Sequence, residues 1–105
     1  TEPFIQSNAT VVNNLQNDLG AGSPEGYASC CEALAKADVR EQLKDISVPV
    51  LVVAGQQDPV TTVADGQYMV DRIANSQLFE INASHISNIE KPEAFNQAVQ
   101  KFIAA

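Results

Sequence analysis

Positively charged side chains are scarce in this chain of 105 residues. Six Lys and Arg side chains stand against thirteen Asp and Glu side chains, which gives a net charge of −7 at pH 7. A surface with this charge repels the phosphate groups of nucleic acids and of anionic membranes. We therefore expect no nucleic acid and no membrane surface among the partners of this protein.

Long apolar runs are also absent. No stretch approaches the roughly 18 consecutive apolar residues that a membrane-spanning helix needs. The first residues, Thr-Glu-Pro-Phe, have neither the basic start nor the apolar core of a signal peptide. With 45% hydrophobic residues the chain has the length and composition of one folded domain. We expect this domain to be cytoplasmic.

Cysteine and histidine are few. The two cysteines, Cys30 and Cys31, are adjacent, so a disulfide framework is not expected. We expect both to be small buried side chains in a helix, with a reactive thiol or a metal ligand as the alternatives. A zinc site needs about four ligands, and one histidine with two adjacent cysteines does not supply them. No metal is therefore expected.

Apolar residues recur every three or four positions in five segments. This period predicts helices over residues 4–19, 24–35, 38–46, 62–74 and 92–103. Ser23 before Pro24, and Thr62 with Asp65 three residues later, are typical helix starts. Gly66 lies inside one predicted helix at a cost of about 1 kcal/mol relative to Ala, so tight packing or a loose first turn is expected there.

Two short segments read as strands. Residues 50–54 are apolar without interruption, which is typical of a strand covered on both faces in a parallel sheet. Residues 77–81 form a second such segment. Together with the helices over 62–74 and 92–103, they predict a β-α-β-α arrangement over residues 49–105 and the α/β class.

Two side chains that can take part in proton transfer follow these strands. Asp58 comes after the first strand and His85, the only histidine, comes after the second, 27 residues later. A β-α-β crossover places both loops at the same edge of the sheet, so we predict that the two side chains touch. A carboxylate that binds the imidazole orients it and stabilises its protonated form, as in a nucleophilic triad. The alternative is that Asp58 is a turn residue and His85 only precedes a helix.

The nucleophile of such a triad does not stand out. The order Ser, Asp, His is that of α/β-hydrolases, which places the nucleophile before Asp58. The chain has no Gly-x-Ser-x-Gly sequence and no glycine-rich segment for an oxyanion hole, and the serines before Asp58 lie in predicted helices or linkers: Ser7, Ser23, Ser29 and Ser47. Either the two residues form no triad, or the chain is the C-terminal part of something longer.

Several stretches carry a family resemblance. Residues 49–61, from Pro-Val-Leu-Val-Val-Ala-Gly to Asp-Pro-Val-Thr, and residues 84–90, Ser-His-Ile-Ser-Asn-Ile-Glu, resemble the C-terminal portion of an α/β-hydrolase. Residues 26–34, with Asp38 and Arg40 beyond them, are similar to the 3-oxoadipate enol-lactonases of the β-ketoadipate pathway for aromatic degradation. The resemblance implies that Asp58 and His85 are the acid and the histidine of the triad.

The resemblance also implies an organisation of the chain. Residues 1–22 would be the end of a helical lid, residues 23–48 the helices that lead from lid to core, and residues 49–105 the C-terminal β-α-β-α part of the core, with the last two parallel strands. The implied substrate is a small lactone, and the implied mechanism needs no cofactor or metal. A serine outside this chain would attack the lactone, so residues 1–105 alone are expected to be inactive.

Two other expectations remain open. The edge of strand 50–54 would be bare, so we expect it to pair with an N-terminal piece of the same enzyme or with a second copy of this chain. A different interpretation is a non-catalytic α/β module that binds a partner through this edge or through the helix over 27–34. Another ester or lactone hydrolase of the same fold is the nearest variant of the first interpretation.

Overall fold

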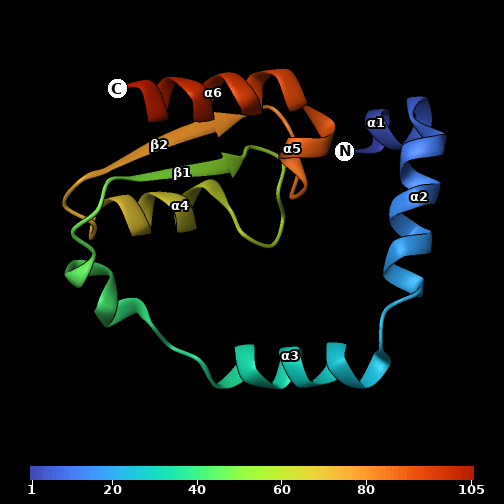
Figure 1. Cartoon of the computed structure of the whole chain (residues 1–105), viewed down its shortest axis with the longest axis horizontal. Coiled ribbons are helices and arrows are strands. Elements are labelled where there is room, and N and C mark those ends of the chain that lie inside the picture. The colour runs from blue at the N-terminus through green and yellow to red at the C-terminus, as the bar shows by residue number, and fades with distance from the viewer. The chain divides into compact units, whose positions relative to one another are not determined.

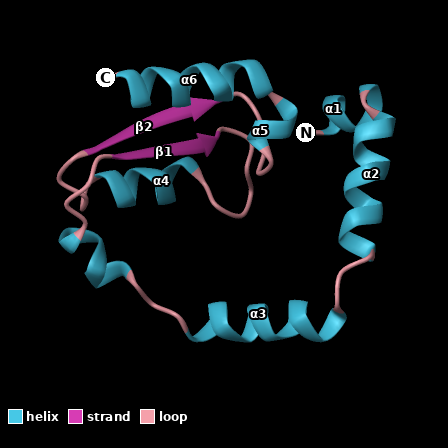
Figure 2. Ribbon diagram, viewed as in Figure 1, coloured by secondary structure: helices cyan, strands magenta, loops and turns pink.

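A computed structural model describes all 105 residues, which form two compact units. One unit contains residues 40–105 together with Thr1, and the other contains residues 2–39. Figures 1 and 2 show the elements of both units. Both strands of the chain belong to the first unit, so this unit contains the sheet.

The sheet has two parallel strands. β1 (Val50–Gly55) pairs with β2 (Ser76–Ile81), with Val50 opposite Ser76 and Gly55 opposite Ile81. The connection between them contains α4 (Val63–Val70), which confirms the predicted β-α-β arrangement and the α/β class. Because the strands are parallel and in register, the loops that follow both of them begin at the same end of the sheet (Figure 1).

A helix covers each face of this sheet. α4 and α6 (Pro92–Ala104) both contact the two strands, and they lie on opposite sides of them (Figure 1). Gly66 of α4 is buried, and a Cβ at this position would lie 3.1 Å from Leu78 Cδ1 and 3.3 Å from Ala54 Cβ. Tight packing against the strands therefore explains a glycine in the helix.

The start of α4 agrees with its prediction, whereas its end does not. Thr62 and Asp65 form a capping box, in which each side chain binds the backbone N–H of the other residue. The helix ends at Val70 instead of at residue 74. The Ser76 hydroxyl donates to the carbonyl oxygens of Val70 (3.1 Å) and Ile73 (2.7 Å), and so satisfies groups that are left without partners at the helix end.

Two shorter helices complete this unit. η1 (Arg40–Asp45) is a 3-10 helix within the segment 38–46, where a helix was predicted. α5 (Ser87–Glu90) was not predicted, because a single turn is too short to show a periodic apolar pattern. It follows the loop that carries His85.

The second unit consists of three helices, α1 (Glu2–Ser7), α2 (Ala9–Gly20) and α3 (Pro24–Lys36). The prediction of one helix over residues 4–19 was wrong at Asn8, where the backbone leaves the helical conformation. The Ser7 hydroxyl donates to Pro3 O (2.7 Å) and the Asn8 side chain donates to Phe4 O (3.1 Å). Short polar side chains that bind backbone carbonyls in this way compete with the helical hydrogen bonds.

The cysteines contradict the sequence-based prediction. Cys30 and Cys31 are exposed, not buried, although the predicted helix around them exists. No residue of α1, α2 or α3 is buried. The apolar spacing predicted the helix correctly, but α3 finds nothing within its own unit that covers its apolar side chains.

The buried core lies in the first unit. Its apolar members are Ala54, Ile73, Ile81 and Ala83, and two polar residues, Asp58 and Ser87, are buried with them. Except for Ile73, which precedes β2, the buried residues lie at the carboxyl ends of the strands or in the segments that follow them.

None of the helices in the structure combines the length and the apolar composition that crossing a bilayer requires.

Candidate active site

Asp58 lies in the turn that follows β1. Its backbone N–H donates to Gly55 O (3.1 Å), which closes the turn. The backbone N–H groups of Val60 and Thr61 donate to Asp58 Oδ1 at 2.9 and 3.1 Å. Pro59 lies between, and its fixed φ limits the conformations of this loop. The carboxylate is therefore held from its own loop before any other element contributes.

His85 lies in the loop between β2 and α5. Its side chain is 65% exposed, whereas that of Asp58 is 3% exposed. His85 Nδ1 lies 2.7 Å from Asp58 Oδ2, a hydrogen-bond distance. The structure thus brings the two side chains together, as the crossover argument predicts. Because Nδ1 faces the carboxylate, Nε2 is the ring nitrogen that remains for proton transfer.

The surroundings of Asp58 favour its ionised form. The pKa of the Asp58 carboxyl lies well below its usual range, chiefly because the Thr61 hydroxyl donates to Oδ2 and then because His85 binds the same oxygen. The N–H groups of Val60 and Thr61 add to this effect, while burial opposes it. Hydrogen bonds to the charged form outweigh desolvation here. The carboxylate is thus ionised at every pH at which a histidine base would work.

Thr61 is a member of the site that the sequence reasoning missed. Its hydroxyl lies 2.6 Å from Asp58 Oδ2 and 3.1 Å from His85 Nδ1. The spacing Asp-x-x-Thr was a usable signal, since a short polar side chain three residues after an aspartate often closes a local hydrogen-bonded turn. This residue therefore contacts both members of the pair.

A close approach of two backbones holds the loops together. A Cβ on Gly55 would lie 2.5 Å from Ser84 O and 2.7 Å from Ala83 O, so only glycine fits. Beside it, the Gln57 N–H donates to Ala83 O (3.0 Å) and the Ser84 hydroxyl donates to Gln57 O (3.3 Å). These contacts fix the separation of the two loops.

Glu90 supports the His85 loop from the other side. Its carboxylate is mostly buried and accepts the backbone N–H of Ser84 at 3.0 Å. Ser84 directly precedes His85, so this bond restrains the backbone from which the imidazole projects. Sequence reasoning placed Glu90 in a family motif and assigned it no contact.

A nucleophile for this pair is not found among the serines of the chain. The hydroxyls of Ser7 and Ser29 donate to helix carbonyls, that of Ser23 caps α3, and that of Ser84 binds Gln57 O, so none of them bonds to His85. No three side chains of His, Cys, Asp and Glu lie where they could jointly hold a metal ion. The arrangement places an imidazole beside an ionised carboxylate, with Nδ1 at the carboxylate.

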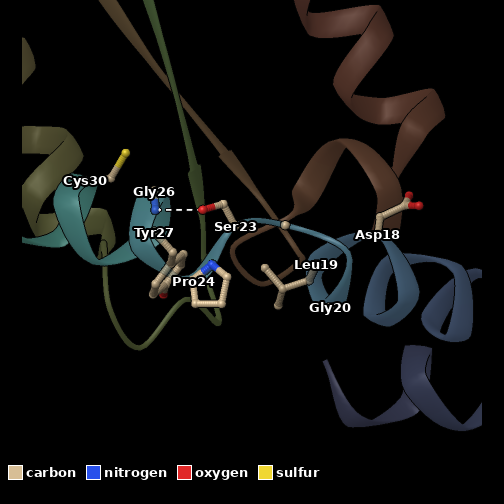
Figure 3. A pocket seen from close by; sticks show the side chains of 9 residues that line it. Asp18, Leu19, Gly20, Ser23, Pro24, Gly26, Tyr27 and Cys30 are labelled. Carbon is tan, nitrogen blue, oxygen red and sulfur yellow. Dashed lines mark hydrogen bonds between the residues drawn. The ribbon is translucent and has the colours of Figure 1, made fainter.

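A pocket of about 700 Å³ lies in the unit of residues 2–39, between the end of α2 and the start of α3 (Figure 3). Its apolar walls come from Leu19, Pro24 and Tyr27, with Cys30 at one side. The Ser23 hydroxyl at its edge accepts the Gly26 N–H at 3.1 Å, as the dashed line in Figure 3 marks. This hollow therefore presents apolar side chains and few polar groups.

Comparisons with known proteins agree with the fold. Residues 16–105 match a protein family described as TAP-like protein. The chain is 61% identical over 100 residues to 3-oxoadipate enol-lactonase 2 of Acinetobacter baylyi, which covers 95% of this chain and 38% of that protein. It is 45% identical to 3-oxoadipate enol-lactonase 1 of the same organism, over 98% of this chain and 39% of that protein.

A solved structure gives the same result in three dimensions. The crystal structure of the enol-lactonase from Burkholderia xenovorans LB400 matches all of this chain with a TM-score of 0.98 at 36% sequence identity. The match covers 40% of that chain. This chain therefore spans about two fifths of the length of the relatives it matches.

Proposed function

The chain belongs to the α/β-hydrolase family described as TAP-like protein and corresponds to the C-terminal part of such an enzyme, and we propose that it supplies the aspartate and the histidine of a Ser-His-Asp triad in a lactone hydrolase. The proposed substrate is 3-oxoadipate enol-lactone, and the product is 3-oxoadipate. The identity with two enol-lactonases supports this choice of substrate.

The observation that carries the proposal is the contact between Asp58 Oδ2 and His85 Nδ1 at 2.7 Å. An ionised, buried carboxylate at this nitrogen holds the imidazole with Nε2 available. It also stabilises the imidazolium that forms when Nε2 takes a proton. A turn residue and a helix-preceding residue without a joint role would need neither the contact nor the support from Thr61.

The proposed reaction has two stages. A serine hydroxyl attacks the lactone carbonyl, while Nε2 of His85 takes the hydroxyl proton. The ring C–O bond breaks, the enol oxygen leaves with a proton from His85, and the enol becomes the ketone. Water then attacks the acyl-serine ester, again with His85 as base, and releases 3-oxoadipate. Asp58 stays ionised throughout, and no step needs a cofactor or a metal.

The proposal requires groups that this chain does not contain. The serine and the oxyanion hole would come from the remaining part of the complete gene product, in which residues 1–22 are the end of a lid, residues 23–48 lead to the core and residues 49–105 end the core. Residues 1–105 alone would be inactive, because removal of the nucleophile leaves only the contributions of binding and of the oxyanion hole.

The bare edge of β1 supports a proposal about partners. The sheet contains only β1 and β2, so one edge of β1 has no strand beside it. We propose that a strand from the rest of the same enzyme pairs there. In the isolated chain a second copy would take this place, and sedimentation of residues 1–105 as a strict monomer would argue against that.

A second candidate function rests on the same edge. A non-catalytic module would use the unpaired backbone groups of β1 to bind a partner strand. The coding sequence upstream separates the two candidates, since a Gly-x-Ser-x-Gly sequence after an apolar strand belongs only to the hydrolase. A hydrolase that prefers another ester or lactone would retain the triad and differ only in substrate.

The test measures hydrolysis of 3-oxoadipate enol-lactone and of a simple aryl ester by the complete gene product. We expect turnover of the lactone and a loss of about four orders of magnitude in kcat for His85→Ala and Asp58→Asn. Glu93→Gln, a change on α6 outside the site, serves as the control. Retained activity in His85→Ala, or no turnover of either substrate by the unchanged protein, would contradict the proposal.

A further inference from the structure

We propose that Thr61 is a positioning residue of the Asp58–His85 pair, whose hydroxyl fixes both the rotation of the carboxylate and the tautomer of the ring. This inference rests on the proposed function and adds a third side chain to the pair. The Thr61 oxygen lies within hydrogen-bond distance of both partners, 2.6 Å from Asp58 Oδ2 and 3.1 Å from His85 Nδ1.

The carboxylate of Asp58 has no acceptor position to spare. A carboxylate offers about four acceptor positions, two on each oxygen. Oδ1 takes the backbone N–H groups of Val60 and Thr61, and Oδ2 takes the Thr61 hydroxyl and the His85 ring. Without the hydroxyl, Oδ2 has one protein partner, and that partner is on a mostly exposed side chain. The hydroxyl is therefore the bond that holds Oδ2 toward the ring.

The positions of the protons follow from the same geometry. Asp58 is ionised and can only accept, so the Thr61 hydroxyl donates its one proton to Oδ2. The Thr61 oxygen then faces Nδ1 with lone pairs. Both groups next to Nδ1 are acceptors, and the proton of a neutral imidazole is thus held on Nδ1. This leaves Nε2 unprotonated, as the proposed base requires.

Thr61 is itself held in place. Its backbone N–H binds Asp58 Oδ1, and the next residue, Thr62, is the N-cap of α4. The capping box between Thr62 and Asp65 fixes the start of that helix. The Thr61 side chain therefore projects from a restrained backbone. Little additional conformational entropy is lost when its hydroxyl forms hydrogen bonds.

The other carboxylates beside these loops are already engaged. Asp65 binds the backbone and the hydroxyl of Thr62, and Glu90 accepts the Ser84 N–H. Their contacts are with the neighbours of Thr61 and His85 and not with Nδ1. Asp58 and Thr61 therefore set the tautomer between them.

The experiment compares three variants of the complete gene product in lactone hydrolysis. Thr61→Val keeps the shape but removes the hydroxyl, and Thr61→Ser keeps the hydroxyl. Thr10→Val makes the same change at an exposed position of α2, outside the site, and is the control. We expect Thr61→Val to lower kcat about tenfold, a factor typical of one hydrogen bond to a charged group, with KM unchanged. Thr61→Ser should recover most of that loss. Thr10→Val should leave kcat within about twofold.

A second readout does not depend on activity. Nitrogen NMR of histidine-labelled protein distinguishes an Nδ1-protonated from an Nε2-protonated ring, and the His85 signals are assigned by their absence from His85→Gln. We expect the Nδ1-protonated form in the unchanged protein and in Thr61→Ser, and a mixture of both forms in Thr61→Val. An unchanged tautomer in Thr61→Val together with unchanged kcat overturns the inference.

The remaining outcomes separate this inference from the proposed function. If His85→Ala abolishes hydrolysis but Thr61→Val and Thr61→Ser lower kcat equally, the methyl packing matters and the role of the hydroxyl is refuted. If His85→Ala keeps full activity, the proposed function fails, and the NMR result alone then decides whether Thr61 sets the tautomer. A loss in Thr61→Val that only follows its fraction of folded protein also counts against the inference.

Discussion

Residues 2–39 and residues 40–105 contain helices with similar apolar patterns but very different burial. α3 carries Tyr27 and Leu34 on an apolar stripe, and both are exposed. In the larger unit, α4 and α6 pack against the two strands, and most of their apolar side chains on that side are half-buried. The comparison teaches that periodicity specifies where a helix forms, whereas a packing partner decides whether its apolar face contributes to stability.

The largest expected difference concerns side chains of similar size in the two units. Ile73 is 2% exposed and Leu34 is 75% exposed. We expect Ile73→Ala to lower the free energy of unfolding by about 2–5 kcal/mol, because it removes buried apolar groups and leaves a cavity. Leu34→Ala should change it by less than about 0.5 kcal/mol.

Urea denaturation of residues 1–105 and of the complete gene product measures both changes. A large effect of Leu34→Ala in the complete gene product alone would show that α3 acquires a packing partner there. A large effect in residues 1–105 would contradict the contrast between the units.

Glycines give the second comparison. In Gly55→Ala, the added Cβ would clash with Ser84 O. We therefore expect the His85 loop to move. The kcat of the complete gene product should fall about a hundredfold, as for a displacement of about 1 Å at a reacting group. Gly20, at the end of α2, has no atom within 4 Å of such a Cβ. Gly20→Ala is the control and should leave kcat unchanged. Equal kcat values for Gly55→Ala and Gly20→Ala would mean that the close approach at Gly55 does not set the position of the His85 loop.

Acid sensitivity gives a third comparison. The folded state lowers the pKa of Asp58 below the unfolded value of about 3.9, so ionised Asp58 stabilises the fold above that pH. This contribution is lost as the pH falls from about 4 toward the folded pKa. We expect Asp58→Asn to lose less stability than the unchanged chain between pH 6 and pH 3, measured by urea midpoints. Asp18→Asn, on the exposed surface of α2, should behave like the unchanged chain.

The smallest expected effect concerns helix caps. Thr62 caps α4, and Ser23 caps α3 by accepting the Gly26 N–H. Loss of either cap costs its helix about 1 kcal/mol. We expect Thr62→Ala to lower the global free energy of unfolding by that amount, because α4 is packed on the sheet. Ser23→Ala should only increase amide hydrogen exchange at the start of α3. If Ser23→Ala also lowered the global free energy of unfolding, the two units would unfold together.

Much of the larger unit could be predicted from local sequence. The apolar run at residues 50–54 predicted β1, and Thr62 with Asp65 predicted the start of α4, because each signal lies within a few residues of the element it specifies. The contact of Asp58 with His85 followed from topology, since a parallel crossover brings the ends of both strands to one edge. Predictions failed where a polar side chain changed the backbone, as at Asn8 and Ser76.

The sequence by itself determined the α/β class, the β-α-β order of the sheet and the two residues that meet at the sheet edge. These properties depend on apolar periodicity, helix caps and chain connectivity, all of which can be read directly from the sequence. Only the tertiary structure decided that Thr61 bridges the pair, that Gly55 fits only without a side chain, and that Cys30 and Cys31 are exposed. The contact of Thr61 with His85 and the approach of Ser84 to Gly55 join loops that are far apart in the chain, and the exposure of the cysteines depends on whether another element packs on α3. No local pattern specifies these contacts.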